Sequence, residues 1–128
     1  MAYLNEKLKQ LEDALSRWKE ALDAKFSDLN RDAAIQRFEF SFELFWKTIK
    51  VYLKEEEKIY CDSPKSCFKE IKNILNLTEK DIETCLKMAD DRNFSVHTYS
   101  EKMANALYKK LKGYWTVANK IVNRIKKQ

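Results

Sequence analysis

Residues 37–53 read RFEFSFELFWKTIKVYL, and this stretch is the strongest indication of an all-helical fold. Its apolar side chains recur at three- and four-residue intervals, which predicts an amphipathic α-helix over residues 31–58. A helix that is apolar on two sides is either central in its bundle or shares one side with another chain. One stripe contains Ile35, Phe38, Phe42, Phe45, Ile49 and Tyr52, and a nearly opposite set contains Phe40, Leu44 and Val51.

A polar strip separates these two apolar sides and contains Glu39, Glu43 and Lys50. Two interpretations remain open. The strip is either solvated and lined with ion pairs, or it faces a partner or an active-site groove. Charged helix faces usually contact solvent, so we favour the first interpretation.

The neighbouring segments also predict helices. A heptad spacing of leucines predicts a helix over about residues 3–25, suited to packing in a bundle. Ser63 before Pro64 starts a short third helix, and Thr78 with Asp81 caps the start of a fourth. The heptad positions are Leu4, Leu8, Leu11, Leu15, Trp18 and Leu22.

The last predicted helix runs from about residue 99 to near the C-terminus, and its apolar stripe again repeats at intervals of four and three. Thr98 and Glu101 match a capping box, which makes Thr98 the expected N-cap. The stripe contains Leu107, Leu111, Tyr114, Ala118, Ile121 and Ile125.

Composition agrees with an all-α fold. The 128 residues include only one Gly and one Pro, which leaves few sites for tight β-turns. Charged residues make up 35% of the chain, and the abundant Lys, Glu and Leu favour helix. We therefore predict one domain over residues 1–128, an antiparallel up-and-down bundle of four to five helices.

The sequence also bears on compartment and cofactors. It has neither an apolar run long enough to span a membrane nor a secretory signal, so we expect a cytoplasmic protein. Cys61, Cys67 and Cys85 form no C-x-x-C pair, so we expect reduced thiols rather than a disulfide or a zinc site. We expect neither a metal ion nor a cofactor.

Charge is concentrated near the C-terminus. Residues 102–128 contain eight Lys and Arg and no Asp or Glu, whereas the chain as a whole has a net charge of +5. This asymmetry favours a polyanionic partner, although a charged helix face is most often only solvated. The residues expected to bind RNA are Lys102, Lys109, Lys120 and Arg124.

Residues 90–101, DDRNFSVHTYSE, carry the candidate chemistry. Arg92 can hold a phosphate, and His97, the only histidine, can move a proton at neutral pH. The start of the following helix adds N–H groups that bind anions. These groups suit metal-independent cleavage of RNA, but on spacing alone a histidine before a helix is more often a capping or packing residue. A homodimer would bring two Arg–His pairs together, with the spare apolar face of the 31–58 helix as the contact.

The segment RNFSVHTY resembles the Arg-x4-His-x-Tyr motif of HepT-type toxins in the HEPN superfamily of all-α proteins. The 37–53 helix also resembles the related nucleotidyltransferase substrate-binding proteins, and the similarity covers the whole chain. The resemblance implies a HEPN-like helical dimer that pairs with a separate MNT-type minimal nucleotidyltransferase in a hetero-oligomer.

For the site, the resemblance implies distinct residue roles. Arg92 and His97 would be the ribonuclease residues, and the partner would neutralise the toxin by adding AMP to Tyr99. Candidate supporting residues are Asp90, Asp91, Asn93, Glu39 and Glu43.

Two alternatives remain beside the endoribonuclease. The chain could instead be a non-catalytic substrate-binding subunit of a two-component nucleotidyltransferase. A purely structural oligomeric scaffold would explain the helices but leave the Arg–His–Tyr grouping as coincidence.

Overall fold

The computed structural model describes residues 2–95 and 100–128, with only the backbone described at 94 and 95. Its elements are α1 (Ala2–Asp23), α2 (Asp28–Tyr52), the π-helix η1 (Leu53–Glu57), α3 (Pro64–Ile74), α4 (Glu79–Ser95) and α5 (Glu101–Lys126). The described residues therefore form an all-α bundle with five α-helices, which confirms the predicted fold class.

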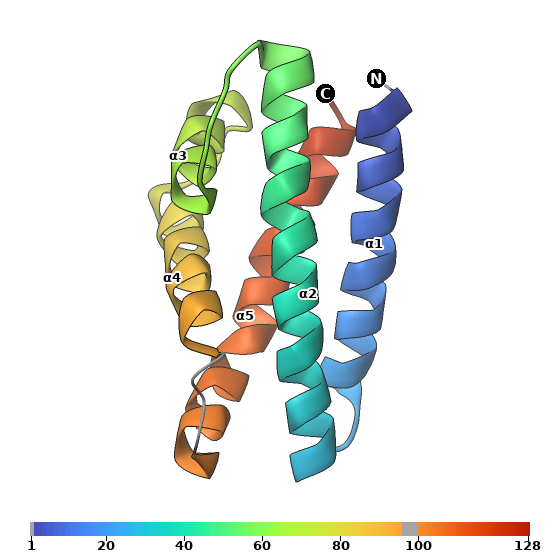
Figure 1. The fold of residues 1–128 in the computed structure, drawn as a ribbon, viewed down its shortest axis with the longest axis vertical. Coiled ribbons are helices and arrows are strands. Elements are labelled where there is room, and N and C mark those ends of the chain that lie inside the picture. The colour runs from blue at the N-terminus through green and yellow to red at the C-terminus, as the bar shows by residue number, and fades with distance from the viewer. Residues whose placement is uncertain (1, 96–99) are drawn as a thin grey trace.

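The three long helices lie side by side, and the two shorter helices cover one flank (Figure 1). The chain ends of α1 and α5 lie at one end of the bundle, and α2 and α5 both begin at the other (Figure 1). The positions predicted to form the 31–58 apolar stripe are all buried, and so are the heptad positions of α1 except the half-buried Leu22. Helix α2 packs against α1, α3, α4 and α5, so it is the central helix.

The second apolar set on α2 has a mixed environment. Leu44 and Val51 are half-buried at the edge of the core, whereas Phe40 is 64% exposed. Part of this side is therefore covered by the chain itself, and part faces outward.

Three of the predicted helix starts agree with the structure to within a few residues. Helix α2 begins at Asp28 because the Ser27 side chain accepts a hydrogen bond from the Asn30 amide. Ser63 caps α3 with Pro64 in the first turn, and Thr78 exchanges hydrogen bonds with Asp81 at the start of α4, as predicted.

The predicted N-cap of the last helix is wrong, although the helix begins within two residues of the predicted start. Helix α5 begins at Glu101, and its N-cap is Ser100, whose side chain accepts from the Met103 amide at 3.1 Å. Serine and threonine are comparable caps, so local sequence did not distinguish Thr98 from Ser100. Helix α4 also continues beyond Asp90 and Asp91 to Ser95.

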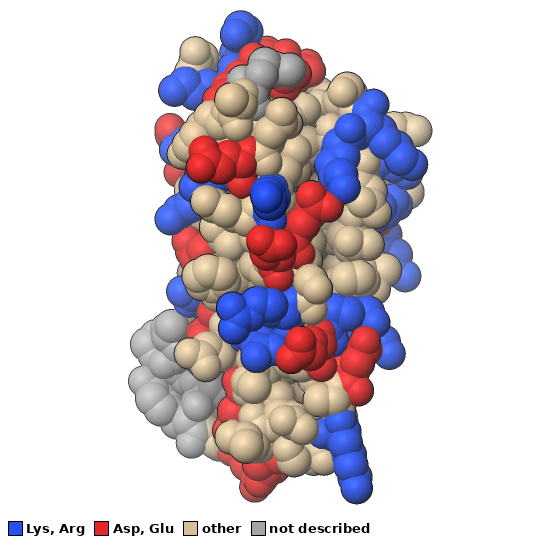
Figure 2. Space-filling view, turned by 90° about the vertical axis from the view of Figure 1, so that its right-hand side faces the viewer, with Lys and Arg blue, Asp and Glu red and all other residues tan. Residues whose placement is uncertain are grey.

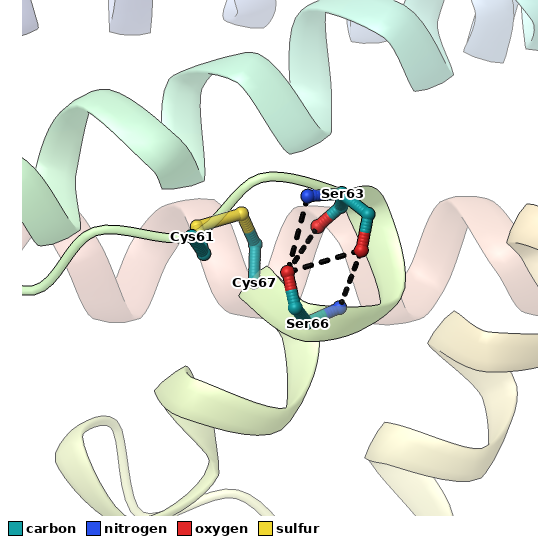
Figure 3. Close-up of a disulfide and its surroundings, with 4 residues drawn as sticks. All are labelled: Cys61, Ser63, Ser66 and Cys67. Atoms are coloured by element: carbon teal, nitrogen blue, oxygen red, sulfur yellow. Dashed lines mark hydrogen bonds between the residues drawn. A yellow bond between two sulfur atoms is a disulfide. The ribbon is translucent and has the colours of Figure 1, made fainter.

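The expectation of reduced thiols is wrong for two of the three cysteines. Cys61 and Cys67 form a disulfide, whereas Cys85 is a buried free thiol (Figure 3). The turn capped by Ser63 and Ser66 folds the chain back, so that the two Cα atoms lie 5.3 Å apart, within the range that a disulfide spans. Sequence spacing alone did not reveal this approach, because it depends on the capped turn between the two cysteines.

Candidate functional site

Arg92 lies near the end of α4, and its side chain points toward α2. Its Nη1 is 3.9 Å from Glu39 Oε2, and its Nε is 3.9 Å from Glu43 Oε1. The side chains of Arg92 and Glu39 are both 25% exposed, so they meet in a half-buried contact between the two helices. The Glu39 and Glu43 part of the polar strip on α2 therefore faces α4 and carries ion pairs there, whereas Lys50 is exposed.

The charges in this contact are shared among several groups. Glu43 also lies 3.7 Å from Lys47 Nζ and accepts a hydrogen bond of 3.4 Å from Trp46 Nε1. Two carboxylates thus lie near the Arg92 guanidinium on the α2 side and offset part of its charge. A phosphate that binds Arg92 must compete with these carboxylates.

Asp90 and Asp91 join α4 to other helices. Asp90 pairs with Lys65 at 2.6 Å, at the start of α3. Asp91 accepts a hydrogen bond of 2.5 Å from the hydroxyl of Tyr114 and lies 3.4 Å from Lys110 Nζ, both on α5. Burial, followed by the hydrogen bond to Asp91, raises the pKa of Tyr114, so its hydroxyl stays protonated and remains a donor. Among the described contacts, these carboxylates therefore join α4 to α3 and α5, and neither of them pairs with Arg92.

The start of α5 is held by a buried arginine that the sequence analysis did not identify. Arg31 is 6% exposed, lies 3.6 Å from Glu101 and donates a 3.0 Å hydrogen bond to Asn105. It therefore fixes the first turn of α5 against the first turn of α2. The acidic residues on either side of it, Asp28 and Asp32, were the only signal in the sequence.

Of the other residues predicted for this site, some lie outside the described part of the chain and one is exposed. His97 and Tyr99 lie outside the described residues, as does Thr98, so the structure places none of them beside Arg92. Asn93 is exposed on α4.

The basic face of α5 divides into two parts. Lys102 and Lys109 are exposed. Lys120 pairs with Asp81 at 2.7 Å, and Arg124 donates to the carbonyl oxygens of Leu75 and Asn76, at the end of α3. These two cations already hold helices together, so the part of the predicted RNA-binding face that remains for a ligand is smaller than expected.

The same contacts shift the pKa of Asp81. Burial raises it, but hydrogen bonds from Lys120 and Thr78 outweigh that effect and lower the pKa below 3.8.

Two kinds of feature are absent from the described part of the chain. No group of three or more His, Cys, Asp or Glu side chains is arranged there to hold a metal ion. No helix in those ranges is both long and apolar enough to cross a membrane.

Comparisons with known proteins give consistent results. Residues 4–127 match the family model described as nucleotidyltransferase substrate binding protein like. The fold is similar to the crystal structure of a protein from Thermus Thermophilus, designated ttk003001694, with a TM-score of 0.85 and 37% identity. That match covers 90% of this chain and 98% of the Thermus chain. No curated protein matches.

Proposed function

Because the chain belongs to the nucleotidyltransferase substrate binding protein like family, we propose that it works with a separate nucleotidyltransferase. In this proposal the chain is a metal-independent endoribonuclease, and the nucleotidyltransferase silences it by adding AMP to Tyr99. Two copies of the chain form the active unit, in complex with that enzyme.

The placement of Arg92 carries the ribonuclease proposal. The guanidinium is held between α4 and α2 by Glu39 and Glu43, five positions before His97 in the sequence. A guanidinium fixed in this way stabilises the negative charge that develops on a phosphate during cleavage. Glu39 and Glu43 act in the proposal as positioning residues for Arg92.

The cleavage step requires no metal. His97 takes the proton from a ribose 2′-hydroxyl, and the resulting 2′-oxygen attacks the adjacent phosphorus atom. The bond from phosphorus to the 5′-oxygen breaks, and this oxygen takes a proton from the protonated histidine of the second copy. The products are a 2′,3′-cyclic phosphate and a 5′-hydroxyl.

The silencing step uses ATP. The Tyr99 oxygen attacks the α-phosphorus of ATP, pyrophosphate leaves, and the phenol proton passes to solvent. The attached AMP places a phosphate next to the ribonuclease residues, where it excludes the RNA phosphate by its volume and its charge.

Cleavage of RNA tests the first part of the proposal. We expect the purified protein to cleave single-stranded RNA in the presence of EDTA, and His97→Ala to lose at least about 100-fold in rate, as expected for loss of a general base. Lys9→Ala, at an exposed position of α1, serves as the control. Equal cleavage by His97→Ala and the wild type would contradict the assignment.

Mass spectrometry tests the second part. Incubation with ATP and the partner nucleotidyltransferase should add the mass of AMP to the wild type but not to Tyr99→Phe, and the modified protein should no longer cleave RNA. Modification at another residue, or full cleavage after modification of Tyr99, would overturn the proposed silencing.

A second candidate is a non-catalytic substrate-binding subunit. The family description favours it, and so does the pairing of Arg92 with two carboxylates, which offsets the charge needed to bind phosphate. This candidate requires a stable complex with the nucleotidyltransferase and no RNA cleavage by the protein alone. Cleavage by the purified wild type would exclude it.

A further inference from the structure

A groove of about 560 Å³ runs between α4 and α5, apart from the contact of Arg92 with α2. Lys80 and Lys87 line it from α4, and Lys110 lines it from α5. Gly113 and Val117 of α5 also line it and are called its floor below, and the remaining lining residues are Thr84, Tyr114 and Thr116. The groove therefore combines lysines with apolar and hydroxyl-bearing side chains.

The lysines on the α4 side are available to a ligand. Lys80 and Lys87 are exposed, and within the described ranges no carboxylate lies within ion-pair distance of either. They are two helical turns apart, about 10 Å along the axis. Lys110, across the groove, is 55% exposed and has a long contact of 3.4 Å with Asp91. The α4 side of the rim therefore carries two lysines without a carboxylate partner among the described residues, whereas Lys110 on the α5 side shares its charge with Asp91.

The face on the side of α1 can be compared with the groove (Figure 2). On the side of α1, Lys and Arg alternate with Asp and Glu, and no large area has a single sign of charge (Figure 2). The lysine rim of the groove therefore differs from the α1 face, where both signs of charge are present.

Gly113 leaves the backbone of α5 uncovered beside the groove. It is the only glycine in the chain, and it lies inside α5, where glycine destabilises a helix relative to alanine. A Cβ atom built at Gly113 meets nothing within 4 Å, so the packing of this chain does not require glycine there. A glycine on the groove floor instead allows a bound molecule to approach the helix backbone closely.

One end of the groove lies beside Asp91 of α4. Lys110 and Tyr114 line it, and both contact Asp91, the residue that precedes Arg92.

We propose that the α4–α5 groove binds the phosphodiester backbone of single-stranded RNA. Lys80, Lys87 and Lys110 contact phosphates as point charges, and the floor around Gly113 and Val117 receives the sugars and bases. That the nucleic acid is RNA rests on the proposed function, whereas the lysine rim and the glycine floor do not.

Binding is measured by fluorescence anisotropy with a labelled oligouridylate, in the full-length protein carrying His97→Ala. This background removes the proposed cleavage, so loss of groove binding and absence of ribonuclease activity are separate results. Lys80→Gln with Lys87→Gln should weaken binding roughly tenfold and lower the slope of log K against log salt by about 1.4, since each contact with a single strand contributes about 0.7.

Two further variants separate the groove from charge in general. Lys9→Gln with Lys54→Gln removes the same charge from exposed positions that do not line the groove, and should bind within about twofold of the background protein. Gly113→Leu removes no charge but fills the floor, so it should weaken binding while its Tm does not fall.

Three outcomes would overturn the proposal. The first is equal loss of binding in the two lysine pairs. The second is unchanged binding by a folded Gly113→Leu. The third is displacement of the oligouridylate by polyglutamate as effectively as by unlabelled RNA, which would assign the groove to an acidic protein segment instead.

Discussion

Asp91 and Arg92 are adjacent in the sequence but contact different helices. Successive side chains on an α-helix differ by about 100° around its axis. Asp91 therefore meets Tyr114 on α5, whereas Arg92 meets Glu39 on α2. The first residue fixes where α4 lies, and the second lies in the candidate site.

Tyr114→Phe tests the contact with Asp91. The substitution removes a hydrogen bond to a carboxylate at a buried position, so we expect a loss of about 2 kcal/mol in the free energy of unfolding. Urea denaturation at neutral pH measures it. Tyr108→Phe, at a half-buried position of α5, is the control and should change stability by less than about 0.5 kcal/mol.

The same variant predicts a pH dependence. Burial and Asp91 raise the pKa of Tyr114 above its ordinary value of 10.0, so above this pH the unfolded chain loses a proton that the folded protein keeps. The wild type should therefore lose stability relative to Tyr114→Phe as the pH rises above about 10. A stability difference that stays constant or grows in that range would contradict the interpretation of this contact.

At the scale of elements, the connection between α2 and α3 is the most constrained. The α-helix α2 ends at Tyr52, and the chain continues as the π-helix η1, whose C-cap Lys58 has a left-handed φ of 57°. The chain then passes Cys61, whose disulfide to Cys67 holds the connection against the first turn of α3 (Figure 3).

Loss of this disulfide should destabilise the protein. Cys61→Ser with Cys67→Ser opens a loop of about seven residues, for which chain entropy gives a loss of about 2 kcal/mol in the free energy of unfolding. Reduction of the wild type should lower its urea midpoint to about that of the double variant. The same reductant should leave the midpoint of the double variant unchanged. If the midpoint of the wild type does not respond to reductant, the disulfide does not contribute to stability.

At the scale of the whole molecule, α2 still presents apolar side chains to solvent. Leu29 is 78% exposed and Phe40 is 64% exposed, and together with Val51 they share one helix face, because three turns separate each from the next. This is the outward part of the second apolar side, to which the proposed homodimer assigns a second copy of the chain.

Phe40→Glu tests that assignment. A carboxylate at this position must be desolvated in an apolar contact, so we expect the dimer to dissociate at least tenfold more readily, as sedimentation equilibrium would show. Gln10→Glu, at an exposed position of α1, adds the same charge and should leave self-association unchanged. Self-association of Phe40→Glu at the wild-type strength would place the contact elsewhere.

Much of the fold follows from the sequence because burial of apolar side chains is periodic. The intervals of three and four residues determined the helices, and the side chains Ser63, Pro64, Thr78 and Asp81 determined where two of them begin. The Arg-x4-His-x-Tyr segment identified the candidate residues by itself, since it lies within one stretch of chain.

Which charges meet across helices depends on the tertiary structure and not on any local pattern. The pairing of Arg92 with Glu39 and Glu43, the use of Lys120 and Arg124 to hold α3 and α4, and the Cys61–Cys67 disulfide depend on how the segments approach one another. The lysine groove between α4 and α5 has the same origin. A helical pattern specifies which side of a helix is apolar, but the neighbour of each polar side chain is set by the packing of the whole bundle.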